Sequence, residues 1–286
     1  MLPSTKPDLS FDEQGVCAAC QNYGDRPNID WQARADEFVE LVQRVNDGSP
    51  TKWDCIVPVS GGKDSTAQVL KVLEYGLNPL CVTSTTCDLS EVGRANIENI
   101  KNQGVDYIEY SPNKVARRKL NRIGLEEVGD IAWPEHVGIF TVPVRAAVAH
   151  RVPLILWGEN SQNEYGGPAL AAGGKVLDRR WLEEYGGLLG MRVSDLEGKL
   201  GLTARDFELY TYPTDQQLAE VGVTGLFLGH FFPWDGYSNA LVAQANGFQS
   251  LGRTVEGSIV DYENLDNHQH GVHDYFKFLK FGFGRS

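Results

Sequence analysis

The stretch CIVPVSGGKDST, residues 55–66, decides how this chain folds. It begins as a short apolar run rich in β-branched residues, which is typical of a buried parallel strand. The run breaks at Ser60-Gly61-Gly62, and residues 64–75 then place apolar side chains at helical spacing. Glycines let backbone N–H groups approach an anion closely, and a helix N-terminus adds partial positive charge. The order of strand, glycine turn and helix therefore predicts a phosphate-binding loop.

Two common nucleotide motifs do not fit this loop. A Walker A motif needs a glycine five residues before its Gly-Lys pair and Ser or Thr after the lysine, but Val57 and Asp64 stand there. No G-x-G-x-x-G follows the strand either. The loop instead resembles the SGGxDS signature of the PP-loop ATP pyrophosphatases, which bind ATP by its terminal phosphates and expel pyrophosphate when the α-phosphorus is attacked. The alternative interpretation is a Gly-Gly turn whose Ser and Asp residues only cap the helix.

Composition narrows the classes of protein that this chain can represent. Its 286 residues are 42% hydrophobic, enough for one large α/β domain with small appendages. The net charge of −12 argues against nucleic acid as the main partner. The sequence contains no apolar run long enough to span a membrane and begins without a signal-peptide pattern. Five cysteines in a chain of this length favour a reducing, cytoplasmic location.

Strand-like and helix-like segments alternate along the chain. Strands are predicted near residues 55–59, 79–86, 107–110, 153–157 and 225–231, and helices at 30–46, 64–75, 91–101, 113–125 and 141–151. This alternation predicts an α/β fold with a doubly wound, parallel, five-stranded sheet of Rossmann-like type in the order 3-2-1-4-5. We divide the chain into an N-terminal cysteine-containing segment (1–29), an ATP-binding core (30–168), a mostly helical lid or substrate insertion (169–224), and the last strand with the C-terminal tail (225–286).

The fourth predicted strand runs into the polar stretch Gly158 to Pro168. In a doubly wound sheet, strands one and four are neighbours at the switch point, where ligands bind beyond the carboxyl ends of the strands. We therefore expect Glu159 and Asn160 to line one pocket with Ser60–Ser65. Ordinary loop capping by these polar side chains is the alternative.

Three other features leave alternatives open. The basic helix 113–125 carries Arg117 and Arg118, which indicate a solvated face, a site for the phosphates of a nucleotide sugar, or a docking face. Cys17 and Cys20 form a C-x-x-C pair, which is half of a zinc ribbon or a pair without metal. His230, at the end of the last predicted strand, is a general acid/base candidate, although we favour a structural role.

Beyond the loop, the chain resembles the bacterial N-acetyl sugar amidotransferases, PP-loop enzymes of surface-polysaccharide and lipopolysaccharide O-antigen pathways. The matching segments are LPSTKPDLSFDEQGVCAAC (2–20), VPVSGGKDS (57–65), WGENSQNEYGGP (157–168) and YFKFLKFGFGR (275–285), which together span nearly the whole length. Family members carry a further C-x-x-C just upstream of the first segment, and they continue past the last one. The sequence therefore resembles a member trimmed at both ends, with half of the zinc ligands absent.

The resemblance implies an ATP-dependent ligase that converts the N-acetyl group of a nucleotide-linked sugar into an acetamidino group through an adenylated imidate. Mg²⁺ would accompany ATP, and separate glutaminase and cyclase-like subunits would supply ammonia. The implied ATP-binding residues are Val59, Ser60, Gly61, Gly62, Lys63, Asp64, Ser65, Thr83, Lys280 and Arg285. The implied catalytic residues are Lys63, Asp64, Glu159 and Asn160, with Asp64 also placing Mg²⁺. Asn160, Asn163, Arg117 and Arg118 are the implied substrate-binding residues.

Two rival functions remain. A tRNA sulfurtransferase uses the same adenylation but needs an exposed, activated cysteine near the loop, for which Cys87 is the candidate. A non-catalytic ATP-binding subunit is the other rival. It would bind ATP without releasing AMP and pyrophosphate.

Overall fold

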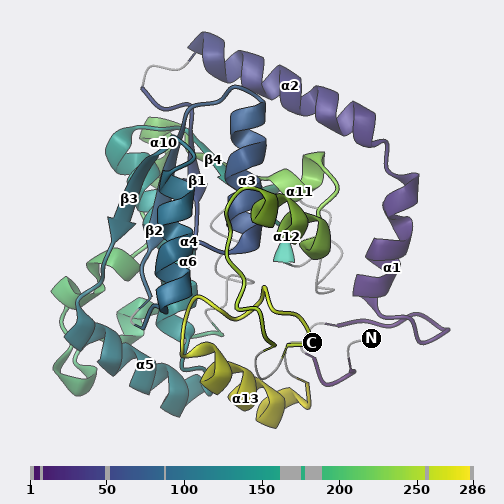
Figure 1. Ribbon diagram of the computed structural model, residues 1–286. Helices are drawn as coiled ribbons and strands as arrows, with labels where there is room; N and C mark the ends of the chain where they lie inside the picture. The colour runs from purple at the N-terminus through teal and green to yellow at the C-terminus, as the bar shows by residue number, and fades with distance from the viewer. Residues whose placement is uncertain are drawn as a thin grey trace.

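The structure is a computed structural model, and it describes residues 3–6, 9–48, 52–86, 88–161, 175–177, 189–254 and 258–283. Strand β1 (Cys55–Pro58) lies inside a mixed α/β fold built on a mostly parallel sheet (Figure 1). The other strands are β2 (Pro79–Ser84), β3 (Asp106–Tyr110), β4 (Leu154–Trp157), β5 (Val176–Leu177) and β6 (Thr224–Phe227). The described residues form a six-stranded sheet in the order β3-β2-β1-β4-β6-β5.

Helices cover both faces of this sheet, as its continuous apolar strands require. Successive residues of β1 point to opposite faces. Val57 packs in one core with residues of α2 (Trp31–Gly48), α3 (Lys63–Glu74), α4 (Glu91–Lys101) and α11 (Leu228–Phe231). Ile56 packs in a second core, mainly against α6 (Trp133–His150). Both β1 residues are fully buried, so this strand anchors the loop that follows it.

The sheet differs from the predicted five-stranded one in strand number and order. The extra strand, β5, pairs antiparallel with β6 at the edge of the sheet. Two residues are too few to show the alternating pattern by which strands are recognised in a sequence. The five parallel strands run in the order β3-β2-β1-β4-β6. The last of them, expected at 225–231, ends at Phe227, and the chain continues directly into α11, which contains His230.

Several helices also depart from expectation. The N-terminal segment, in which no helix was predicted, contains α1 (Ala18–Asp25) and the 3₁₀ helix η1 (Arg26–Asn28). Neither helix has a fully buried residue, so neither carries the apolar periodicity that predicts a helix. Helix α6 begins eight residues earlier than expected, with a proline in its first turn, where proline is well tolerated. The C-terminal helix α13 (His270–Phe281) ends at Gly282, whose φ of +75° closes it.

The remaining helices lie around this core. Helix α5 (Lys114–Val128) packs against α6, and α12 (Gly236–Ala245) packs against α3. Within 189–224 the chain forms η2 (Val193–Leu196), η3 (Lys199–Gly201), η4 (Ala204–Tyr210) and α10 (Asp215–Val221). Buried side chains of η2 and η4 share a third core with α5 and α6. Along the described part of the chain, no helix combines the length and apolar character needed to cross a membrane.

Candidate functional site

The loop after β1 is closed by hydrogen bonds between its own residues. The Ser65 hydroxyl donates to the Gly62 carbonyl over 3.0 Å, and the Gly62 N–H donates to the Ser60 hydroxyl over 3.2 Å. Gly62 stands at the N-cap of α3, which receives no side-chain hydrogen bond from this residue. A helix start without a capping side chain leaves its first N–H groups to other partners, and anions are favoured partners there.

Gly61 is the position that only glycine fits. Its φ is +92°, and a Cβ added there would lie 2.9 Å from Ile97 Cγ1 and 3.3 Å from the Ile97 backbone nitrogen. Ile97 belongs to α4 and is almost fully buried, so it has little room to move. The loop backbone therefore lies directly against α4, and its conformation depends on a glycine at 61.

Lys63 lies at the centre of a compact charge cluster. Its Nζ is 2.6 Å from Asp64 Oδ2 and 2.5 Å from Glu263 Oε1, and its side chain is only 6% exposed. Burial opposes the positive charge, but the two carboxylates outweigh it and raise the pKa of Lys63 above its ordinary value. The second oxygen of Asp64 accepts a 2.9 Å hydrogen bond from Asn239. Lys63 is thus held charged, with two carboxylates beside it.

A cavity of about 430 Å³ opens in front of this cluster. It is lined by the loop, by the carboxyl ends of β2 and β4, and by the segment 262–274. Glu159 lines the cavity together with Ser60 and Asp64, whereas Asn160 is buried and does not line it. The cavity thus lies at the switch point between β1 and β4, with Glu159 and Ser161 as polar side chains from the β4 side.

The end of β2 forms another wall of the cavity. Thr83 is buried, and its hydroxyl donates to the Val59 carbonyl, which links the two strand ends. Val59 and Thr83 both line the cavity.

Sequence reasoning missed the wall formed by residues 262–274. Glu263 from this segment contacts Lys63, and Asn264 donates to Asp274 Oδ2 over 2.7 Å. The signal was present in the sequence, because DYENLDNHQH (261–270) is as rich in hydrogen-bonding side chains as the predicted ligand loop after β4. Because this segment follows no buried strand, its place beside the loop could not be predicted from the order of the strands.

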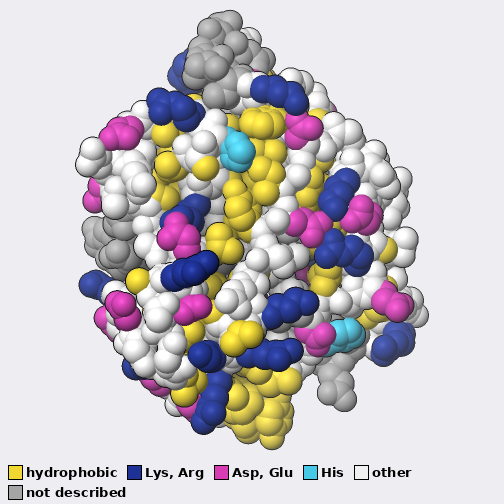
Figure 2. Space-filling view, turned by 90° about the vertical axis from the view of Figure 1, so that its left-hand side faces the viewer, with side chains coloured by type: hydrophobic (Ala, Val, Ile, Leu, Met, Phe, Trp, Pro, Cys, Tyr) yellow, Lys and Arg dark blue, Asp and Glu magenta, His cyan; other side chains and the backbone are white. Residues whose placement is uncertain are grey.

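Arg117 and Arg118 of α5 face different surroundings. Arg117 is 1% exposed, forms an ion pair with Glu135 and donates to the Tyr210 hydroxyl over 3.2 Å. The prediction that Arg117 lies on a solvated or docking face is therefore wrong, because this side chain is buried and paired with Glu135. Arg118 is exposed. On the face shown in Figure 2, Lys and Arg side chains are interspersed with Asp and Glu side chains.

The structure does not bring the C-terminal lysine to the loop. Lys280 donates to the Val128 carbonyl over 2.7 Å and lines a separate, smaller cavity of about 260 Å³. Lys280 lies ten residues after the first residue of α13, and this position brings its side chain to the end of α5. Asn163, Arg285 and Cys87 lie outside the described residues.

Cys17 and Cys20 lie close together, as the C-x-x-C spacing predicts. A hydrogen bond with the Cys17 thiol raises the pKa of Cys20. A structural zinc ion needs four ligands, and within the described ranges no further His, Cys, Asp or Glu joins this pair. The two cysteines alone do not fit a closed zinc site.

His230 is held by charged neighbours away from the cavity. Its ring contacts Arg34, and its Nε2 lies 3.6 Å from Glu37 Oε2. Burial, and after it the charge of Arg34, lowers the pKa of His230 to about 4. His230 does not line the loop cavity, which agrees with the structural role that we favoured.

Comparisons with known proteins add little to this geometry. No family model and no curated protein matches the sequence. Among solved structures, NMN synthetase from Francisella tularensis is similar, with 12% sequence identity and a TM-score of 0.34 over 79% of this chain and 100% of the other. A likeness of this size carries no conclusion about the function of this chain.

Proposed function

We propose that this chain is an AMP- and pyrophosphate-forming ligase of PP-loop type, which converts the N-acetyl group of a nucleotide-linked sugar into an acetamidino group. One observation carries the proposal. The SGGKDS loop opens onto a cavity of about 430 Å³ in which carboxylates stand beside a buried lysine. The resemblance of four sequence segments to N-acetyl sugar amidotransferases suggests the substrate class.

The loop would hold the β- and γ-phosphates of ATP. Backbone N–H groups at the start of α3 and the hydroxyls of Ser60 and Ser65 are suitable donors to phosphate oxygens. Lys63 would add positive charge while its carboxylate neighbours keep it protonated. Gly61 allows the close approach of the backbone.

The carboxylates that line the cavity would repel the phosphates of ATP alone, but they can bind a magnesium ion that accompanies ATP. Asp64, Glu159 and Glu263 line the cavity, and carboxylate oxygens are preferred ligands of Mg²⁺. Such an ion would neutralise phosphate charge and orient the α-phosphorus for attack. Asp64 is the best placed of the three, because it follows Lys63 directly at the start of α3.

The reaction would proceed in two displacement steps. The oxygen of the N-acetyl amide attacks the α-phosphorus, an O–P bond forms, and the bond to the pyrophosphate leaving group breaks. Ammonia then attacks the amide carbon of the adenylated imidate, AMP leaves with the original amide oxygen, and one proton is lost as the acetamidino group forms. Most of the catalytic effect would come from positioning and charge stabilisation.

Ammonia would come from separate glutaminase and cyclase-like subunits. Because Arg117 is buried, a docking face on α5 would use the exposed Arg118 and Arg122 instead. Charge reversal at these two residues is expected to reduce glutamine-dependent activity and to spare activity with free ammonium. Equal losses in both assays would reject α5 as the docking face.

The two described cysteines on core strands do not suit the sulfurtransferase alternative, whose candidate nucleophile Cys87 lies outside the described residues. Cys55 and Cys81 are fully buried, and burial raises the pKa of the Cys81 thiol to about 12. Such a thiol is protonated at neutral pH and is a poor nucleophile.

Turnover decides between the proposed ligase and a non-catalytic ATP-binding subunit. The protein is incubated with ATP, Mg²⁺, ammonium and a panel of nucleotide-linked N-acetyl sugars, and the products are analysed by mass spectrometry. The proposal expects AMP, pyrophosphate and a sugar whose amide oxygen is replaced by NH, and it expects Asp64→Asn to abolish all three. Arg122→Met, at an exposed position on α5, is the matched control and should leave turnover unchanged. ATP binding without turnover would identify a non-catalytic subunit, and ADP with phosphate would refute the ligase.

A further inference from the structure

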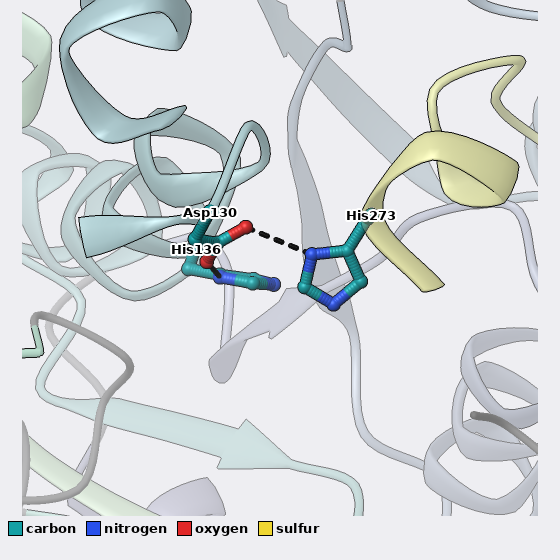
Figure 3. A group of neighbouring side chains, drawn as sticks. All are labelled: Asp130, His136 and His273. Atoms are coloured by element: carbon teal, nitrogen blue, oxygen red, sulfur yellow. Dashed lines mark hydrogen bonds and ion pairs between the residues drawn. The ribbon is translucent and has the colours of Figure 1, made fainter. Parts of the chain in front are cut away.

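His273 joins Asp130 and His136, which are close in sequence, from a distant part of the chain (Figure 3). Asp130 lies between α5 and α6, His136 lies in the first turns of α6, and His273 lies on α13. His136 Nδ1 is 3.0 Å from Asp130 Oδ2, and His273 Nδ1 is 2.8 Å from Asp130 Oδ1. Figure 3 shows the carboxylate between the two imidazole rings.

The carboxylate at the centre of this group is buried, with a side chain only 7% exposed. Within the described part of the chain, its ion pairs are with the two imidazoles, which carry no charge unless they are protonated. The Ala132 N–H donates to Asp130 Oδ1 over 2.8 Å, but this bond adds no charge. Buried carboxylates are ordinarily paired with a cation or coordinate a metal ion. A metal ion held by the same three side chains would compensate the charge of this carboxylate.

We propose that Asp130, His136 and His273 bind a divalent transition-metal ion of the zinc class. One ligand atom from each residue can be chosen so that all three lie within 4.8 Å of one another. Ligand atoms of a tetrahedral zinc ion, with bonds of about 2.0–2.1 Å, are about 3.3 Å apart. The imidazoles now contact different oxygens of Asp130, at 3.0 and 2.8 Å, so small side-chain shifts would have to bring one ligand atom of each residue to this mutual distance. Each neutral imidazole would move its remaining proton to Nε2, so binding through Nδ1 would need no change in protonation state.

The donor set indicates which ions fit. Two imidazoles and one carboxylate suit zinc, cobalt, iron or manganese, whereas Mg²⁺ and Ca²⁺ prefer oxygen ligands alone. The proposed site is therefore chemically distinct from the carboxylates around Lys63. Three protein ligands also leave a coordination position open.

Of the two cavities that reach these side chains, the loop cavity gives a cation the better access. His136 and His273 line this cavity, and they are 33% and 25% exposed, so an ion can reach them. Asp130, His136 and His273 also line the smaller cavity, but Lys277 and Lys280 line it too, and their charges disfavour the approach of a cation from there. A bound ion would also fasten α13 to the start of α6. The inference does not depend on the proposed ligase activity, because a metal site can be tested without turnover.

The experiment is carried out in a Cys17→Ser, Cys20→Ser background, so that metal at the C-x-x-C pair does not contribute. The chelator-treated protein is loaded with zinc or cobalt, dialysed and analysed for metal content. We expect one equivalent per chain, and visible absorption of four- or five-coordinate cobalt without the near-ultraviolet band that thiolate ligands produce. Hydrogen exchange of α13 should slow when zinc is added.

Glutamine substitutions separate metal binding from a hydrogen-bonding role. His136→Gln and His273→Gln retain a side-chain N–H for Asp130 but lose the imidazole, and each is expected to lower bound metal to background. His270→Gln is the matched control, since His270 lies on the same helix and lines the same cavity, and it should retain the metal. Failure of the parent protein to bind zinc or cobalt, or full retention of metal in both glutamine variants, would overturn the proposal.

Discussion

Replacing Gly61 with alanine is expected to lower the free energy of unfolding by about 2–5 kcal/mol. Two costs add up to this figure. The backbone φ of +92° is unfavourable for a residue with a side chain, at about 1–2 kcal/mol. The new Cβ would lie 2.9 Å from Ile97 Cγ1 on a buried helix face, and overpacking of this kind costs about 1–3 kcal/mol.

Urea unfolding measures the effect, and Gly76→Ala is the matched control. Gly76 has a similar φ of +78°, but an added Cβ there meets nothing within 4 Å. The control should lose only the backbone cost of about 1–2 kcal/mol. Equal losses in the two variants would show that contact with α4 does not hold the loop. Unchanged Mg·ATP affinity in Gly61→Ala would refute the claim that the loop needs close backbone approach.

Three further predictions follow from the charges. Arg117→Met should destabilise the protein by about 3–5 kcal/mol in urea unfolding, because it leaves the buried Glu135 unpaired, while the exposed Arg118→Met should change stability by less than about 0.5 kcal/mol. Chelation of Mg²⁺ should weaken ATP binding, measured by calorimetry, by roughly tenfold or more. The reason is that several carboxylates line the cavity, whereas Lys63 is the single Lys or Arg among its described lining residues. Undiminished ATP binding in EDTA would contradict this charge balance. For Glu109, burial raises the pKa, but hydrogen bonds from Arg94 and Lys101 outweigh it and lower the pKa below the ordinary value of 4.5. Its stability advantage over Glu109→Gln should therefore be fully present above about pH 5 and shrink as the pH falls through the lowered pKa, and an advantage that grows in acid would contradict this sign.

The parallel core and the loop could be predicted from the sequence because their signals are local. The apolar run 55–59, the glycines at 61–62 and the helical spacing after them each indicate one structure. The two-residue β5 and the short helices of 189–210 bury few side chains in any regular pattern, so their ends came only from the structure.

The placement of charged side chains was harder to predict. On α5, Arg117 shares the buried stripe with Leu120 and Gly124, at spacings of three and seven residues. A helical wheel places Arg117 on this stripe, but the positive charge of its side chain favoured the interpretation as a solvated face. Glu263 was missed for another reason: the contact with Lys63 joins residues 200 apart, and no local pattern encodes it. The grouping of Asp130 with His273 depends in the same way on how α13 packs.

An isotope-transfer experiment tests the central claim most directly. A nucleotide-linked N-acetyl sugar labelled with ¹⁸O in its amide carbonyl is incubated with the protein, Mg·ATP and ammonium, and the nucleotide products are analysed by mass spectrometry. Attack of the amide oxygen on the α-phosphorus predicts that the label appears in AMP and that unlabelled pyrophosphate is released. Label in inorganic phosphate, with ADP as the nucleotide product, would show attack at the γ-phosphorus and would contradict the assignment of the Ser60–Ser65 loop as a pyrophosphate-binding site.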